Sequence, residues 1–111
     1  MEKRWVVLAV EFWLHAMRDE RARLLMAEQY ERARTVTGEL IASIYGKAGR
    51  QPPFAPRDLA IVIEALSVGL AFQAALDPAH VRMSLQAEVL ARLLGLPTPG
   101  IAATPTEPAT S

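Results

Sequence analysis

Two segments of this chain are apolar on nearly every side of a helix, and this feature limits its possible folds more than any other. The first is WVVLAVEFWLHAM, Trp5 to Met17. The second runs from Leu59 to Phe72, where Glu64 and Ser67 are the only side chains able to form hydrogen bonds. A helix that is apolar all round must be buried, in a large core or in a membrane. A chain of 111 residues supports only a small core of its own, so both helices need neighbours on most of their sides.

The opening apolar run is too short and too interrupted to be a membrane or targeting segment. Glu11 and His15 break it well before the roughly 20 apolar residues that a spanning helix needs. The charged sequence Arg18 to Arg21 follows directly, where a signal peptide would have small residues for cleavage. The sequence therefore predicts no membrane partner and a cytoplasmic location, which the lack of cysteine also suits.

Hydrophobic periodicity predicts four helices and hence an all-α fold, an antiparallel helical bundle. The helices are expected at Lys3–Met17, Asp19–Tyr45, Pro56–Leu76 and Asp77–Leu94. Residues 1–95 account for all of them as a single domain. Residues 96–111 are rich in Pro, Thr and Ala and cannot bury enough apolar surface to offset their ordering entropy, so they are predicted to be a disordered tail.

Local signals set the expected helix ends. Asp19 can cap the second helix through its carboxylate, and Gly46 is the expected stop because glycine adopts the left-handed conformation without steric cost. Asp77 is expected to cap the fourth helix, with Pro78 in its first turn. Gly95 is the expected end of that helix.

The second and fourth helices each present only one apolar face to the others. The opposite face of the second helix is predicted to be solvated and carries Arg21, Arg23, Glu28, Glu31, Arg32, Arg34 and Glu39. Four such helices leave apolar surface uncovered in a monomer, and at about 25 cal/mol per Å² a few hundred Å² left wet costs several kcal/mol. The expected cover is a second copy of the chain, another segment of a longer protein, or an apolar ligand.

Charge and motifs exclude several function classes. Twelve basic and twelve acidic side chains balance, so the chain has no electrostatic footprint for nucleic acid. No phosphate-binding loop or nucleophile–base pair is evident, which predicts a protein that is not an enzyme and has no cofactor and no catalytic residues. His15 and His80 lie on different helices without other ligands, so no metal site is predicted. Glu11 and His15, four residues apart, form either an acid/base pair or a polar stripe that can contact a ligand.

The order of these elements resembles a known family. The segments that carry the resemblance are EFWLHAMRDERARLLMAEQYERARTVTGELI, a Gly/Pro loop, PRDLAIVIEALSVGLAFQAALDP and a last helix that ends VLARLLG. Together they look like the C-terminal regulatory half of TetR-type transcriptional repressors, from about Trp5 to Gly95. The most informative features are the aromatic pair Phe12-Trp13 before the charged Arg18-Asp19 break, and the apolar helix with an internal Gly69.

The resemblance implies a homodimer in which the third and fourth helices of both subunits form a four-helix bundle, while the first two helices wall a pocket for a small, mostly apolar inducer. Operator DNA would be read only by an N-terminal helix-turn-helix domain, which is expected before residue 1 and is missing here. The chain would then be a fragment, the product of a misplaced start, or a truncated paralogue. Inducer binding would control DNA release by that domain. The alternative is a stand-alone helical interaction module that forms mixed dimers with an intact repressor.

The resemblance also assigns candidate residues to the two contacts. The ligand-binding candidates are mainly large apolar side chains, for which a plain core role is the alternative: Trp5, Phe12, Trp13, His15, Met17, Met26, Tyr30 and Phe72. The dimer-interface candidates lie along the third and fourth helices: Val62, Leu66, Gly69, Gln73, Leu76, Met83, Gln86, Leu90 and Leu93. Gly69 costs helix stability relative to alanine, so a close helix approach, within the chain or across the dimer, would explain its presence.

Overall fold

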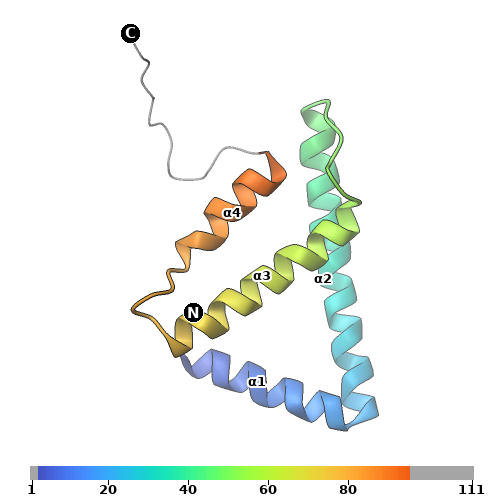
Figure 1. The fold of residues 1–111 in the computed structure, drawn as a ribbon. Helices are drawn as coiled ribbons and strands as arrows, with labels where there is room; N and C mark the ends of the chain where they lie inside the picture. The colour runs from blue at the N-terminus through green and yellow to red at the C-terminus, as the bar shows by residue number, and fades with distance from the viewer. Residues whose placement is uncertain (1–2, 96–111) are drawn as a thin grey trace.

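The computed structural model describes residues 3–95, which form four α-helices and, within that range, no strand. The helices are α1 (Lys3–Arg18), α2 (Glu20–Lys47), α3 (Pro56–Leu76) and α4 (Ser84–Leu94). The all-α fold class is confirmed. Figure 1 shows α1, α2 and α3 as three sides of a triangle, with α4 running back along α3. The predicted disordered tail, residues 96–111, lies outside the described residues.

Two of the predicted helix ends are confirmed, and a third lies a few residues further along the chain. The Asp19 carboxylate accepts hydrogen bonds from the backbone N–H groups of Arg21 and Ala22, at 2.9 and 3.2 Å, and so caps α2. Gly95 follows α4 with a left-handed backbone, φ 69°. Gly46, in contrast, lies inside α2, and it is Gly49 that adopts positive φ in the turn after that helix.

The prediction that Asp77 and Pro78 begin the fourth helix was wrong. Asp77 instead ends α3, and α4 begins only at Ser84. The Asp77 carboxylate is occupied by the Nδ1 atom of His80, at 3.0 Å, while its carbonyl oxygen accepts from the N–H groups of His80 and Val81. The carboxylate and the carbonyl oxygen of Asp77 thus both close a local turn. The residues between Asp77 and Ser84 therefore connect the two helices, and Met83 lies just before α4.

The core is small and lies where α2, α3 and α4 meet. Ile41, Tyr45, Leu59 and Leu94 form it, with Ile63 packed against them. The Tyr45 hydroxyl donates a hydrogen bond to the carbonyl oxygen of Leu94, which satisfies one of the free carbonyls at the end of α4. This cluster fixes the end of α4 against the C-terminal half of α2.

The described chain is a thin plate. Its extents are 62 × 37 × 16 Å and its radius of gyration is 17.4 Å, whereas a compact domain of this size would have roughly 13 Å. Large apolar side chains consequently remain exposed, among them Trp5, Phe12 and Met17 of α1, Val36 of α2 and Leu76 of α3. The sequence-based expectation that one copy leaves apolar surface uncovered is confirmed.

Helix α3 is the most apolar element of the plate. It is the one described helix that is long and apolar enough to cross a membrane, with a mean hydropathy of 2.0. Glu64 lies near the middle of α3. Helices α1, α2 and α4 all pack against α3. Few of its residues are buried within the chain, so much of its apolar surface is available to a further partner.

Candidate functional site

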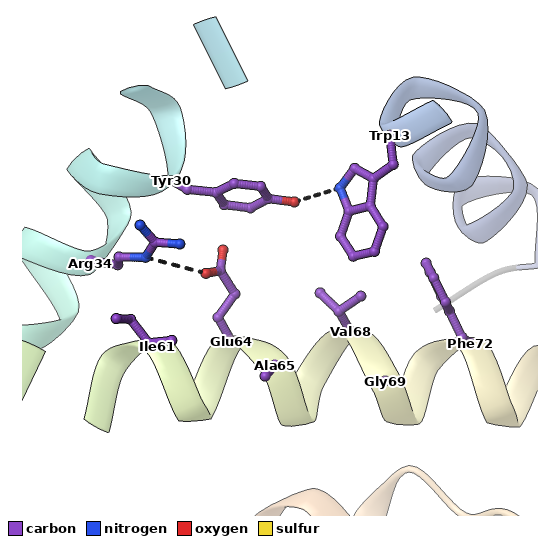
Figure 2. Close-up of a pocket in the computed structure, with 9 residues that line it drawn as sticks. All are labelled: Trp13, Tyr30, Arg34, Ile61, Glu64, Ala65, Val68, Gly69 and Phe72. Atoms are coloured by element: carbon purple, nitrogen blue, oxygen red, sulfur yellow. Dashed lines mark hydrogen bonds and ion pairs between the residues drawn. The ribbon is translucent and has the colours of Figure 1, made fainter. Parts of the chain in front are cut away.

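An open pocket of about 440 Å³ lies on one face of α3, where α1 and α2 approach it (Figure 2). Its lining combines aromatic, aliphatic and charged side chains: Trp13, Tyr30, Arg34, Ile61, Glu64, Ala65, Val68, Gly69 and Phe72. The α3 members recur at intervals of three and four residues, which places them on one side of a helix, and Tyr30 and Arg34 are likewise four apart on α2. The volume falls within the usual range for small-molecule sites.

Aromatic rings from three helices meet at this pocket. The Trp13 indole Nε1 donates a hydrogen bond of 2.7 Å to the Tyr30 hydroxyl oxygen. The ring of Trp13 also lies 5.4 Å from that of Phe72, centroid to centroid, at an interplanar angle of 57°. This separation and tilt are favourable for an aromatic pair. One tryptophan thus links α1 to both α2 and α3, as Figure 2 shows.

The pocket also contains two charged side chains, which face each other from α2 and α3 (Figure 2). The Arg34 Nε lies 3.8 Å from a carboxylate oxygen of Glu64, and both side chains are largely covered, at 27% and 28% exposed. The Arg34 guanidinium carbon lies 5.9 Å from the centroid of the Tyr30 ring, within range of a cation–π contact. The pocket therefore combines aromatic side chains with one carboxylate, that of Glu64, and one guanidinium group, that of Arg34.

A second carboxylate, that of Glu31, also lies close to Arg34. The guanidinium of Arg57 holds it through two hydrogen bonds, and Arg34 Nη1 lies 3.5 Å from it. The hydrogen bond from Arg57 is the main cause that lowers the pKa of Glu31 below its usual value. This corner therefore brings together two carboxylates and two guanidinium groups.

Arg34 corrects the sequence prediction that placed it on a solvated face of the second helix. Its side chain is mostly covered, because Glu64 and the Tyr30 ring approach it from two sides. Two sequence signals could have identified this pair. Arg34 follows Tyr30 by one helical turn, and Glu64 is the only charged residue within the long apolar part of α3.

Two further hollows adjoin this pocket. A groove of about 1030 Å³ between α1 and α2 includes Trp5, Leu8, Ala9, Phe12, Trp13, His15, Ala22, Leu25, Met26, Gln29 and Tyr30. A smaller hollow of about 310 Å³ includes Trp13, Met17, Met26 and Tyr30. All eight ligand-binding candidates therefore line at least one of three adjoining hollows, and Trp13 and Tyr30 line all three. None of the eight is fully buried, and their role in binding stays a prediction.

The residues weighed as acid/base or metal-binding groups lie at the surface. Glu11 and His15 are both exposed, and no hydrogen bond or ion pair joins them. His80 is exposed and bonded to Asp77. In that described range no group of three or more His, Asp or Glu side chains could hold a metal ion.

The dimer-interface candidates occupy different environments along α3 and α4. Val62, Gln73, Leu76 and Leu93 are exposed, and the remaining five are partly buried. Gln86 already bonds within the chain, since its side-chain amide donates to the Ser67 hydroxyl oxygen and joins α4 to α3. A Cβ added at Gly69 would meet nothing within 4 Å, so no close approach within the described chain requires glycine there. The interface itself stays a prediction.

Comparison with protein-family models matches residues 1–96 to the family described as "BetI-type transcriptional repressor, C-terminal". The matched range includes every described helix and all the hollows above. Neither the curated proteins nor the solved structures gave a match.

Proposed function

Since this chain belongs to the family of BetI-type transcriptional repressor C-terminal domains, we propose that it senses a small, mostly apolar ligand and forms a homodimer through α3 and α4. Its family is one of non-enzymatic transcriptional regulators, and such C-terminal domains generally dimerise and bind small ligands. The resemblance to TetR-type repressors seen in the sequence is thereby confirmed. A regulator of this kind works in the cytoplasm.

The observation that carries the ligand-sensing part is the pocket at the junction of α1, α2 and α3. Trp13, Tyr30 and Phe72 supply aromatic surface from three separate helices, and Arg34 and Glu64 supply two convergent polar groups. Ligand sites are typically apolar cavities with a few such polar groups. Because each wall belongs to a different helix, a bound ligand would change how these helices lie relative to one another.

The dimerisation part is supported by the uncovered surface of α3. Val62 and Leu76 are exposed on this helix, and Leu93 is exposed on neighbouring α4. A second copy would cover these side chains through the same face of its own helices, in a two-fold symmetric contact.

The position of α3 between these two proposed contacts supports control of DNA by the ligand. One side of the helix lines the pocket, while α4 packs along it and the rest of its apolar surface is free to meet a partner. A ligand that shifts α3 would change the geometry of the dimer, and with it the spacing of two DNA-reading heads. On this proposal the heads belong to a helix-turn-helix segment outside these residues, because the charge of this chain is balanced.

Sedimentation equilibrium of the purified chain tests dimerisation. We expect a dimer for the wild type and a monomer for Leu66→Glu, because a carboxylate in an apolar contact is strongly unfavourable. Val36→Glu is the matched control, since it introduces the same charge at an exposed apolar position of α2 and should leave the dimer intact. A monomeric wild type at high micromolar concentration would contradict the dimerisation part.

Uptake of Nile red, a neutral apolar dye that emits strongly in apolar surroundings, tests the pocket. Ala65→Phe places a ring in the pocket and should lower the emission, whereas Ala42→Phe makes the same change at an exposed position of α2 that lines none of the three hollows. Equal emission from both variants would contradict ligand binding at this pocket.

A further inference from the structure

Helix α2 carries a row of exposed side chains, mostly apolar, that the pocket and the proposed α3–α4 dimer leave free. Its largest members, Leu25, Val36 and Leu40, are 58%, 67% and 59% exposed. The row recurs at intervals of three and four residues, which places it on one side of the helix. This α2 stripe spans about 30 Å and comprises Leu25, Gln29, Ala33, Val36, Leu40 and Ile44.

The two halves of the α2 stripe have different surroundings. Leu25 and Gln29 line the groove of about 1030 Å³ between α1 and α2, which meet at one corner of the triangle in Figure 1. Val36 and Leu40 project from the C-terminal half of α2, where Ile41 packs into the core. One half of the stripe is therefore part of a groove, and the other half is a ridge of exposed side chains.

A row of charged side chains runs beside the α2 stripe. Arg21, Glu28, Arg32 and Glu39 follow at intervals of seven, four and seven residues, so they share one side of α2. All four are exposed, and their signs alternate. Reversing the helix about residue 30 exchanges Arg21 with Glu39, and Glu28 with Arg32. The row is therefore complementary in charge to a copy of itself that runs in the opposite direction.

The same reversal fits the two halves of the stripe together. It brings Val36 of each copy opposite Leu25 of the other, and Leu40 opposite Ala22, which also lines the groove. The ridge of each copy would thus enter the groove of the other, and two-fold symmetry would make both contacts at once. The formal charge of the chain is zero, so no general repulsion opposes the approach of a second copy.

We propose that this face binds a second copy of the chain through an antiparallel, two-fold symmetric pair of α2 helices. The proposal goes beyond the function above, because it uses α1 and α2 where the proposed dimer uses α3 and α4. The α2 pair would join two such dimers into a tetramer, and only this step rests on the proposed dimer. Exposed ion pairs contribute little, so the tetramer should form at higher concentration than the dimer.

Sedimentation equilibrium of the full chain at about 10 and about 500 µM tests the pairing. We expect a dimer at the lower concentration and a tetramer at the higher one. Leu40→Glu should remain a dimer at both, because its carboxylate would have to enter an apolar groove. Leu24→Glu makes the same change at a position that is 54% exposed and lies outside the stripe, so this control should still form the tetramer.

Charge reversals test the antiparallel register. Arg21→Glu alone and Glu39→Arg alone should each weaken the tetramer about tenfold, because two-fold symmetry turns two attractions into two repulsions. An equimolar mixture of the two variants should restore it, since each new charge then meets an opposite charge in the other chain. Arg23→Glu reverses an exposed charge of α2 outside the row and should associate like the wild type.

Three outcomes would overturn the proposal. The first is a wild type that stays dimeric at the higher concentration, including the case in which Leu25→Glu abolishes Nile red emission because a small molecule occupies the groove instead. The second is a tetramer of Leu40→Glu. The third is a mixture of the two reversal variants that associates no better than either variant alone.

Leu66→Glu separates this proposal from the proposed function. At the higher concentration it should form a dimer through α2 alone, and its combination with Leu40→Glu should stay a monomer. A wild type that is monomeric at the lower concentration, and pairs at the higher one only when Leu40 is intact, would reject the α3–α4 dimer and support the α2 pair.

Discussion

The indole nitrogen of Trp13 donates a hydrogen bond of 2.7 Å to the hydroxyl oxygen of Tyr30, and this bond joins α1 to α2. Both residues line each of the three hollows described above. The bonded pair therefore forms part of the lining of the pocket, of the groove and of the smaller hollow. A change in this one bond would alter the shape of each of them.

Tyr30→Phe should lower the free energy of unfolding by about 1 kcal/mol, because it leaves the Trp13 N–H without its acceptor. Urea unfolding followed by circular dichroism measures the change. Trp13→Phe in the Tyr30→Phe background should cost less than it costs in the wild type. Additive losses in the two backgrounds would show that the hydrogen bond contributes nothing.

Leu59→Ala should be among the most destabilising substitutions in the chain. Leu59 is 1% exposed and lies in the small core with Tyr45 and Leu94, so its removal leaves a cavity worth about 2–5 kcal/mol. Leu24→Ala, at a position that is 54% exposed, should change stability by less than about 0.5 kcal/mol. Similar urea midpoints for the two variants would contradict the position of the core.

Gly69→Leu should have opposite effects on the monomer and on the dimer. Within the chain an added Cβ meets nothing within 4 Å, and replacing a helical glycine stabilises a helix by up to about 1 kcal/mol. Across the proposed dimer the larger side chain would prevent close approach. We expect sedimentation to show a monomer, and circular dichroism to show unchanged helical content. If this variant and Leu66→Glu both remain dimeric, the contact lies elsewhere.

The Glu31–Arg57 pair should make stability depend on pH in the acidic range. The pKa of Glu31 is lowered chiefly by its hydrogen bond from Arg57. The unfolded chain therefore takes up a proton at higher pH than the folded one, so this stabilisation is present above the ordinary value of 4.5 and is lost as the pH falls through the lowered folded pKa.

Urea midpoints measured from about pH 6 down to about pH 3 would test this dependence. The wild type should lose more stability over the range than Arg57→Met, which lacks the main cause of the lowered pKa. Arg32→Met, which removes an exposed arginine from the same helix as Glu31, should follow the wild type. Parallel curves for Arg57→Met and the wild type would show that the pair does not contribute.

The parts of the fold that local chemistry decides could be predicted from the sequence. Asp19 caps α2 because its acceptor is within reach of the next N–H groups whatever the rest of the chain does. Gly95 ends α4 for an equally local reason. Asp77 shows the limit of this reasoning. The same side chain can cap a following helix or close a turn with His80, and the sequence alone does not say which.

The candidate site was predictable in its residue types and not in its connections. Aromatic residues such as Trp13 and Phe72 are few in this chain, so the sequence alone identifies them as candidates. Arg34 was placed among solvated charges, because its cover comes from Glu64 on a different helix. Which charged side chain loses contact with water depends on how helices cross, and helical periodicity contains no information on that angle.

The 16 Å thickness of the plate has a further consequence for its mechanics. Helices that pack in a single layer lack neighbours above and below to resist a change in the angles between them. On the proposed function, a molecule bound at the junction of α1, α2 and α3 would act on these angles directly, and a small ligand would bend the plate where a rounder protein would only accommodate it.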